Sequence, residues 1–253
     1  MKLTFLGTGT SQGVPVIACT CPVCQSKDEK DKRLRTSVLI EVDDRIFVID
    51  SGPDFRYQML RAKVPHLNGI LFTHEHKDHT AGLDDIRAFN WVNKAAVDVY
   101  AEKRVQEALK KEFSYVFAEQ KYPGIPELHL WEVKNEAFRI DGVTVLPIRA
   151  MHLKLPVFGY RIGDLTYITD ANYIAPEEME KIRGSKVLVI NALRKEKHIS
   201  HFTLGEALKI IEEVKPEKAF LTHISHQMGF HEAITRELPP NVELAYDGLE
   251  LTL

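Results

Sequence analysis

The sequence predicts a protein of the α/β (α+β) class, built from two mixed β-sheets that are flanked by helices. Short apolar runs typical of strands occur in both halves of the chain, and segments with helical spacing lie between them. Histidine and aspartate residues recur directly after several of the apolar runs. Because loops at strand ends often carry functional side chains on a rigid scaffold, we expect a site at one rim of the sheets.

The first half of the chain supplies an opening strand, a hairpin and a strand that leads into a histidine-rich segment. Apolar runs predict strands at residues 2–6, 37–42, 45–49 and 69–72. The second and third of these runs are joined at Asp43-Asp44, which indicates a hairpin. The stretch of residues 95–136 is expected to hold a further strand, an amphipathic helix and a short connection. Apolar residues at helical spacing predict helices at residues 54–63, 84–93 and 103–117.

The second half again mixes the two kinds of element. Apolar runs predict strands at residues 143–149, 157–162, 165–169, 186–190, 219–222, 242–245 and 249–251. A helix at residues 176–183 begins with Pro176, at the position where proline is favoured. A second helix at residues 203–214 begins with Thr203 and has Glu206 three residues later, which is typical of a capping box.

Composition and charge limit the classes of function. A chain of 253 residues fits one large domain or two small ones, and we expect a single domain over residues 1–253. The formal net charge of −3 excludes a global basic field that would hold nucleic acid nonspecifically. No apolar run is long enough for a membrane span or a signal peptide. We therefore expect a cytoplasmic protein without a membrane partner.

The segment after the strand at residues 69–72 carries the strongest chemical pattern in the chain. It contains His74, His76, Asp78 and His79 within six residues. His74 and His76 are two residues apart, so in extended backbone their side chains point the same way. The turn that follows can present Asp78 and His79 to a second, adjacent ion. Imidazole and carboxylate groups are ligands for divalent ions such as zinc or manganese. A solvated histidine-rich loop or a purely structural metal site is the alternative.

Three further candidates follow strands elsewhere in the chain. They are His152, Asp170 and His223. Each alone is more often an ordinary surface or core residue, but together they supply the ligands that a second ion requires. Two divalent ions held close together lower the pKa of water and stabilise the charge of a displacement reaction.

The cysteines form one cluster, Cys19, Cys21 and Cys24. An odd, clustered set of cysteines in a reducing compartment favours metal binding over a disulfide framework. Three free thiols in a loop are the alternative.

These patterns resemble the metallo-β-lactamase superfamily, whose His-x-His-x-Asp-His motif appears here as residues 74–79. The resemblance extends over nearly the whole chain and includes residues 5–11, 49–52, 169–170 and 222–223. It implies an αββα sandwich with two divalent ions, zinc or manganese. By that resemblance His74, His76 and His152 would bind one ion, Asp78, His79 and His223 would bind the other, and Asp170 would bridge the two.

Within the superfamily the chain is similar to the PhnP cyclic phosphodiesterase branch, which is related to ribonuclease Z. The cysteine cluster is part of that similarity, and His226 is the implied fourth ligand of a closed, structural zinc site. His198 and His231 are also available for that position.

The segment that begins at His201 also resembles the ribonuclease Z and PhnP branch. The resemblance implies that His201 protonates the leaving oxygen or holds the phosphate, and that Asp78 helps to orient the attacking water. A surface histidine at a helix N-terminus is the alternative. Arg194 and His198 lie in the same loop and are weak candidates for contact with an anionic substrate.

The pattern departs from ribonuclease Z, which grips transfer RNA with a long arm. Only 17 residues, 153–169, separate His152 from Asp170, and no long basic insertion appears elsewhere, so a long RNA substrate is disfavoured. We expect a phosphodiesterase for a small, cyclic phosphate diester, with the oligomeric state, a homodimer included, left open. The alternatives are a thioester or lactone hydrolase of the same fold and a PqqB-like protein of cofactor biosynthesis.

Overall fold

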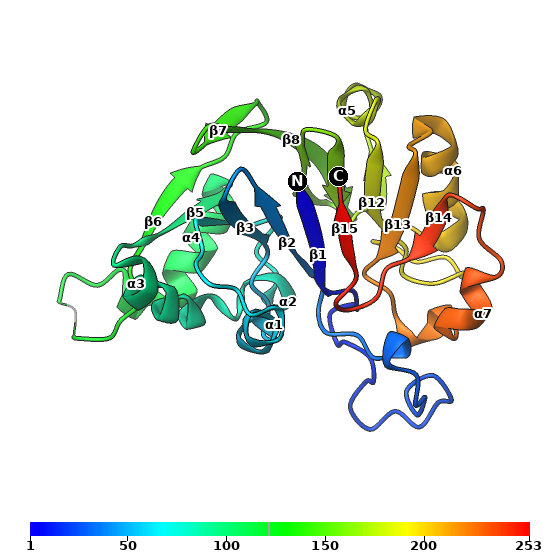
Figure 1. The fold of residues 1–253 in the computed structure, drawn as a ribbon, viewed down its shortest axis with the longest axis horizontal. Coiled ribbons are helices and arrows are strands. Elements are labelled where there is room, and N and C mark those ends of the chain that lie inside the picture. The colour runs from blue at the N-terminus through cyan, green and yellow to red at the C-terminus, as the bar shows by residue number, and fades with distance from the viewer. Residues whose placement is uncertain (121) are drawn as a thin grey trace.

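The computed structural model describes residues 1–120 and 122–253. Two β-sheets stack against each other in the centre, and helices cover the outer face of each sheet (Figure 1). The expected αββα sandwich is confirmed. The two termini lie side by side at one edge of the first sheet, where Met1 and Leu253 exchange hydrogen bonds of 3.1 and 2.8 Å (Figure 1).

The first sheet has seven strands and is built mainly from the first half of the chain. In order across the sheet they are β15 (Glu250–Thr252), β1 (Lys2–Gly7), β2 (Ser37–Val42), β3 (Arg45–Ile49), β4 (Gly69–Leu71), β5 (Val97–Ala101) and β6 (Leu128–Glu132). β2 and β3 form the expected antiparallel hairpin. Its turn residues Asp43 and Asp44 have φ angles of 48° and 60°, as a type I′ turn requires.

The second sheet has eight strands and comes from the second half of the chain. In order they are β11 (Tyr173–Ile174), β8 (Val143–His152), β9 (Leu155–Ile162), β10 (Leu165–Ile168), β12 (Val187–Asn191), β13 (Lys218–Thr222) and β14 (Val242–Leu244), with β7 (Phe138–Ile140) paired to β8. β10, β12, β13 and β14 are parallel to one another. β8 has the same direction as β10, because each is antiparallel to β9. The carboxyl ends of β8, β10 and β13 therefore meet at one rim.

The helices are divided between the two outer faces. Those of the first half are α1 (Phe55–Ala62), α2 (Lys77–Thr80), α3 (Arg87–Asn93) and α4 (Lys103–Glu112). Those of the second half are α5 (Pro176–Ile182), α6 (Leu204–Val214) and α7 (His231–Thr235). Short 3₁₀ turns occur at Glu29–Asp31, Leu83–Ile86, Ser114–Val116 and His226–Met228. The expected capping box at Thr203 and Glu206 is present at the start of α6.

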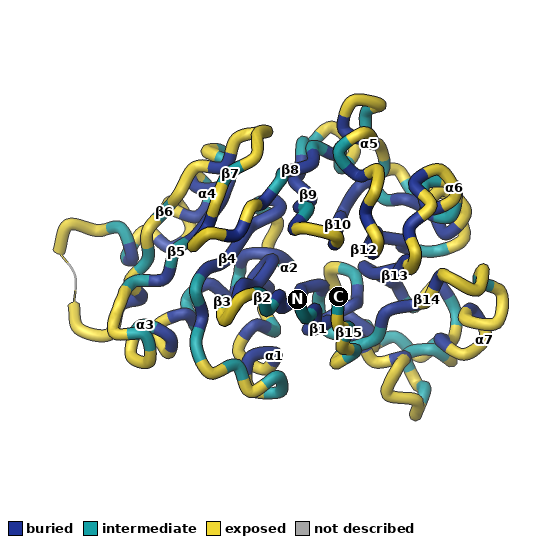
Figure 2. The backbone as a smooth tube through the Cα atoms, turned by 45° about the horizontal axis from the view of Figure 1, so that its top comes forward, coloured by how far each residue is buried: buried dark blue, intermediate teal, exposed yellow. Residues whose placement is uncertain are grey.

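Three apolar cores hold the layers together. The central core joins the inner faces of both sheets and contains Phe5, Phe47, Tyr160 and Phe220. The two outer cores lie between each sheet and its own helices. Figure 2 shows the result, with buried backbone along the strands and exposed backbone in the outer loops and helices.

Two helices differ from the expectation. The helix expected at residues 103–117 ends at Glu112, because Phe113 leaves the helical conformation and packs with Val116 in the outer core through a 3₁₀ turn. Aromatic and β-branched residues lose side-chain freedom in helices, which weakens this end of the pattern. The helix expected at residues 84–93 is split into a 3₁₀ turn and α3.

Three short strands were not expected. They are β6, β7 and β11. β6 lies at the edge of the first sheet with most of its side chains partly or fully exposed, so it lacks the apolar run that marks a buried strand. No helix within the described residues is both long and apolar enough to cross a membrane.

Candidate metal centre

A short segment between β4 and α2 carries His74, His76, Asp78 and His79. β4 is buried, and the segment turns over the end of the neighbouring β3. Gly52 lies under this turn, where a Cβ atom would be only 2.0 Å from the carbonyl oxygen of Asp78. The motif can therefore reach its position only because residue 52 has no side chain.

Three residues within two positions of a strand end have left-handed backbone that side chains rarely adopt. Their φ angles are 65° at Asp50 beyond β3, 50° at Asp170 beyond β10 and 54° at His223 beyond β13. Such conformations are costly in non-glycine residues and concentrate at functional sites. All three side chains are buried, with at most 1% of each residue exposed. The strand ends thus turn three polar side chains into the same closed space.

Asp170 lies at the centre of this space. Its Oδ1 is 2.8 Å from Nε2 of His223 and 2.9 Å from Nε2 of His201. Its Oδ2 is 2.5 Å from Nε2 of His79 and 3.4 Å from Nε2 of His74. One carboxylate therefore joins four histidines from three different segments of the chain.

Two groups of residues around Asp170 could each hold a cation, because the ligand atoms of each group all lie within 4.8 Å of one another. The first group is Asp78, His79, Asp170 and His223, and the second is His152, Asp170 and His201. The rings of the remaining pair, His74 and His76, lie 4.6 Å apart. They lie 5.8 and 5.2 Å from the ring of His152. The structure thus brings together all seven residues expected at the two ions, and adds His201 to them.

The orientation of His152 is set by the loop that carries His201. Nδ1 of His152 is 2.8 Å from the carbonyl oxygen of Ser200, so this nitrogen donates a proton. The Nε2 atom of the neutral ring then keeps a free lone pair for a cation.

The donor set fits divalent cations on physical grounds. The Nε2 atoms of His74, His79 and His223 are buried near Asp170, yet none forms a well-directed hydrogen bond. Buried polar atoms nearly always have partners, and buried carboxylates require compensating charge. Cations shared between these nitrogens and the carboxylates would satisfy both requirements.

The pKa values show how strongly the buried carboxylates demand positive charge. Burial disfavours the charged ring of His79, but Asp78, Asp170 and Asp50 outweigh it and raise the pKa of His79 well above its usual range. Burial also disfavours the charged ring of His223, but Asp170 and Asp78 outweigh it and raise the pKa of His223 to about 9. Burial instead dominates at His74, whose pKa is well below its usual range. The carboxylates thus favour positive charge in this buried space, which a bound cation would supply.

The residue that fixes His79 was not among the expected ligands. Asp50 accepts hydrogen bonds of 2.8 Å from both the backbone N–H and the hydroxyl of Thr73. Its Oδ2 is also 2.7 Å from Nδ1 of His79. A proton on that nitrogen leaves Nε2 free, which is the usual arrangement behind a metal-bound histidine. The position of Asp50 directly after a predicted strand was the sequence feature that could have revealed it.

A second supporting contact lies behind His74 and His76. Glu75, between them, forms an ion pair with Arg104 of α4. Arg104 also donates a 2.6 Å hydrogen bond to the carbonyl oxygen of Pro156 in the β8–β9 hairpin. The arginine therefore links the motif segment to the hairpin that carries His152.

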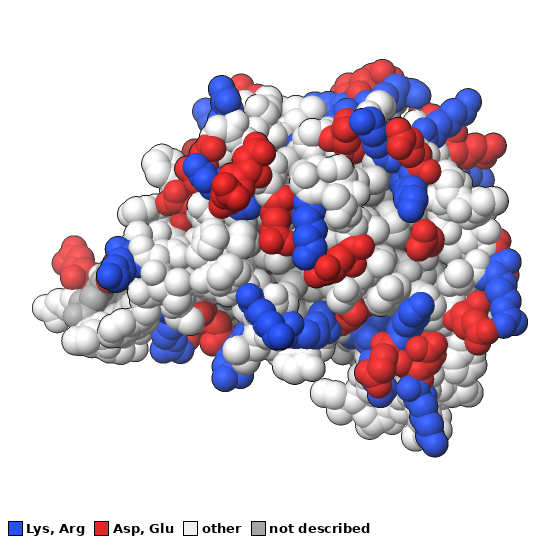
Figure 3. Space-filling view, in the orientation of Figure 1, with Lys and Arg blue, Asp and Glu red and all other residues white. Residues whose placement is uncertain are grey.

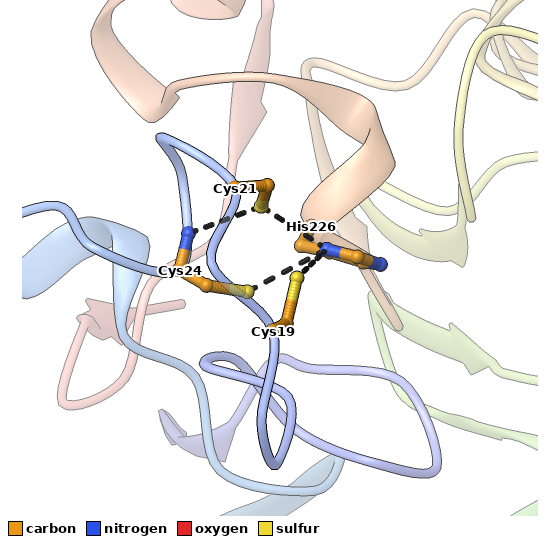
Figure 4. A group of neighbouring side chains, drawn as sticks. All are labelled: Cys19, Cys21, Cys24 and His226. Carbon is orange, nitrogen blue, oxygen red and sulfur yellow. Dashed lines mark hydrogen bonds between the residues drawn. The ribbon is translucent and has the colours of Figure 1, made fainter.

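The cysteine loop forms a separate cluster with His226 (Figure 4). Nδ1 of His226 is 3.4, 3.3 and 3.5 Å from the sulfur atoms of Cys19, Cys21 and Cys24. The backbone N–H of Cys24 and the His226 ring lower the pKa of the Cys21 thiol to about 6, which favours the thiolate that binds metals. Three sulfurs around one imidazole fit a tetrahedral zinc ion.

The other loop residues have different partners. Nδ1 of His198 is 3.1 Å from Nδ1 of His201, and His231 contacts the buried Arg33. The geometry therefore places His226 at the cysteines, and the other two histidines elsewhere. Arg194, a weak candidate for contact with substrate, donates to Gln227 and to the carbonyl oxygens of residues 196 and 197 of its own loop.

Comparison with known proteins identifies the family. The model of the beta-lactamase superfamily domain matches residues 45–224. A crystal structure described as a new diphosphatase from the PhnP family superposes with a TM-score of 0.93 at 38% identity, over 100% of this chain and 97% of that chain. Zinc-bound PqqB from Methylobacterium extorquens has a TM-score of 0.81 at 17% identity, over 100% of both chains, and supports the fold alone.

One relative is much longer than this chain. The octanoyltransferase of Porphyromonas gingivalis is 43% identical over 99% of this chain, but the match covers 51% of that protein. The ribonuclease Z of Thermosynechococcus vestitus is 27% identical over 65% of this chain and 37% of the relative. The chain thus spans about half the length of the octanoyltransferase, and its match covers just over a third of the ribonuclease Z.

Proposed function

Because the chain belongs to the beta-lactamase superfamily, and within it to the PhnP family, we propose that this metallohydrolase cleaves a small, cyclic phosphate diester with two divalent ions. The observation that carries the proposal is the arrangement around Asp170, where two groups of ligand atoms share one carboxylate. Paired sites of this kind suit the displacement at phosphorus, since charge develops on the attacking and the leaving oxygens together.

The proposed ligands would divide between the two ions as follows: His74, His76 and His152 would hold one, Asp78, His79 and His223 would hold the other, and Asp170 would serve both. Zinc or manganese fits these nitrogen and oxygen donors, and when bound it activates water and stabilises the charge on the phosphate. Zinc fits the cysteine cluster, where its role is structural.

Three side chains complete the proposed chemistry. Asp78 orients the attacking water while it serves as a ligand. Asp50 holds the proton on Nδ1 of His79. His201 is only 12% exposed and its Nε2 points at Asp170, so it faces the space where a phosphate would lie. From there it donates its N–H to the leaving oxygen.

The substrate is proposed to be small. On the face drawn in Figure 3, basic and acidic side chains are interspersed, and a long phosphate backbone favours a continuous basic track. The solved PhnP-family relative is described as a diphosphatase, which agrees with chemistry at phosphate.

A thioester substrate is the second candidate, and the observation in its favour is the 43% identity to a protein named octanoyltransferase. That name belongs to a protein about twice as long as the matched region. The assay below therefore includes an octanoyl thioester.

The test is hydrolysis by the purified, metal-loaded protein of bis(p-nitrophenyl) phosphate, a 2′,3′-cyclic nucleotide, a glutathione thioester and an octanoyl thioester. We expect turnover of the diesters. His76→Ala and Asp170→Ala should abolish it with an unchanged circular dichroism spectrum, whereas His129→Ala, at an exposed histidine of β6, should leave it intact. Full activity in either ligand variant, or turnover of thioesters alone, would overturn the proposal.

A further inference from the structure

Four charged side chains connect the two sheets beside the metal centre in a row of alternating charge: Glu75, Arg104, Glu102 and Arg149. Arg104 pairs with Glu75, and its Nη2 is 3.4 Å from Oε2 of Glu102. The other oxygen of Glu102, Oε1, is 2.8 Å from Nη2 of Arg149. We call these four residues the ionic chain.

Both ends of the ionic chain lie next to proposed ligands of the same ion. Glu75 separates His74 from His76, and Arg149 precedes His152 by three residues on β8. The guanidinium group of Arg149 also lies 3.9 Å from the centroid of the Phe158 ring on β9. Because these ligands come from different sheets, their spacing depends on how the two sheets are held together at this point.

The contact between β9 and the motif segment is continued by Arg104. The backbone N–H of Phe158 donates a 3.0 Å hydrogen bond to the carbonyl oxygen of Thr73. Two residues earlier on β9 stands Pro156, which has no N–H to donate. Its carbonyl oxygen instead accepts the 2.6 Å bond from Nη2 of Arg104, while Nη1 of Arg104 donates to Glu75. The two arms of one guanidinium group thus hold β9 and the motif segment together.

The ligands of the other ion are held across the sheets by different contacts. The hydroxyl groups of Thr36 and Thr222 lie 2.9 Å apart in the interior, directly before His223. Directly after His223, the backbone of Ile224 bonds to the segment of residues 8–10. These contacts form without the ionic chain, so a change in the ionic chain should affect one ion before the other.

We propose that Arg104 is a positioning residue for one of the two ions, because through the ionic chain it sets the spacing between His152 and the pair of His74 and His76. The inference rests on the two-ion site of the proposed function. Isolated, exposed ion pairs contribute little, but networks of several charges can fix a geometry. The side chains of the ionic chain are between 23% and 33% exposed, so the network is largely shielded from solvent.

Charge and position predict opposite effects of removing Arg104. Arg104→Met removes a positive charge and leaves the carboxylate of Glu75 uncompensated near the proposed ions, so electrostatics alone would strengthen cation binding. If the arginine positions the ligands, the same substitution weakens binding, by roughly tenfold, the lower end of the range for partners behind metal ligands. Arg104→Lys keeps the charge but lacks the planar fork, so it should recover only part of the affinity.

The test is a titration of the metal-free protein with cobalt(II), whose absorption spectrum reports the ligands of each bound ion. Arg104→Met should raise the dissociation constant of one active-site ion about tenfold, and the band that weakens should be the one that His152→Ala removes. The sulfur charge-transfer band of cobalt at the cysteine cluster should stay unchanged, which shows that the fold is intact.

The matched control is Arg161→Met, at a partly exposed arginine of β9. Arg161 donates hydrogen bonds of 2.9 and 2.6 Å to the carbonyl oxygens of Lys181 and Arg183, without contact to a proposed ligand. Its loss should lower the melting temperature and leave the affinity for cobalt at every site as in the wild type.

Unchanged or tighter binding of both active-site ions in Arg104→Met would overturn the inference, since the arginine would then act through its charge alone. Equal weakening of both ions would also contradict it, because the ionic chain would then support the whole fold rather than one set of ligands. If the wild type binds no cobalt outside the cysteine cluster, the two-ion site of the proposed function fails. Normal cobalt binding without hydrolysis of any diester would refute the proposed substrate and leave the role of Arg104 intact.

Discussion

Replacing Asp50 with asparagine tests whether the buried carboxylate behind His79 sets the affinity of the metal centre. Oδ2 of Asp50 accepts from both the His79 ring and the Thr73 hydroxyl, and Oδ1 accepts from the Thr73 backbone N–H. An amide has one acceptor, so its NH₂ group must face one of these donors. If it faces His79, the ring must move its proton to Nε2, which is the nitrogen needed for the cation. If it faces Thr73, two donors oppose each other in a buried space.

Either arrangement weakens the site that includes His79. Loss of a partner of this kind behind a metal-bound histidine typically costs 10- to 100-fold in metal affinity or activity, equivalent to about 1.4–2.7 kcal/mol. We therefore expect Asp50→Asn to raise the dissociation constant of one of the two active-site ions by that factor. The measurement is a competitive titration with a chromophoric chelator, together with the metal content per chain.

Asp247 provides the matched control. It is also a buried carboxylate, and it accepts 2.8 Å hydrogen bonds from the backbone N–H of Leu34 and from the hydroxyl of Thr8, without contact to a proposed ligand. Asp247→Asn should lower the free energy of unfolding and leave the affinity of the active-site ions unchanged. If Asp50→Asn binds metal as tightly as the wild type, or if both variants lose affinity equally, the reasoning about the His79 proton is wrong.

Three further predictions concern other parts of the fold. Gly52→Ala places a Cβ atom 2.0 Å from the carbonyl oxygen of Asp78, so it should displace the motif and lower both metal content and melting temperature; normal metal content would contradict the close approach. Cys21→Ser should remove about one zinc per chain and destabilise the protein, with a smaller effect on kcat than a ligand substitution at the active site; unchanged zinc content would refute the structural site. Burial and the adjacent Arg33 lower the pKa of His231 to about 4, so its neutral form is favoured in the folded state. Stability should therefore fall as pH drops from about 6.5 towards 4, by up to roughly 2–3 kcal/mol, and His231→Asn, which keeps an acceptor for Arg33, should flatten this fall in denaturant unfolding at pH 7.5 and pH 5. An identical pH dependence in both proteins would exclude His231 as the cause.

The main strands and their end residues could be predicted because local patterns specify them. The run before His74 is buried on both faces, so its side chains are continuously apolar and the polar residues begin where the strand ends. The same change from apolar to polar residues marks Asp170 and His223. Once these runs are assigned to sheets, the shared rim follows from strand direction.

The supporting contacts could not be predicted, because they depend on distant segments. Arg104 is an ordinary residue of an amphipathic helix in the sequence, and only the packing of α4 beside the motif brings it to Glu75. The division of residues 84–93 and the end of α4 likewise depend on how Phe89 and Phe113 pack in the outer core. The place of His201 beside Asp170 depends on the course of the loop that follows β12.

The cysteine cluster and the metal centre are connected through one short segment. His223 belongs to the metal centre and His226 to the cysteine cluster, only three residues later. Ile224 lies between them, where its backbone N–H donates 2.9 Å to the carbonyl oxygen of Thr8 and its carbonyl oxygen accepts 3.1 Å from Thr10. Both bonds join Ile224 to the segment of residues 8–10, which fixes the backbone between the two sites, so we expect movement of His226 to be transmitted to His223. Loss of zinc from the cysteines should therefore weaken cation binding at His223 before it changes proton donation by His201, since His201 is held by a different loop.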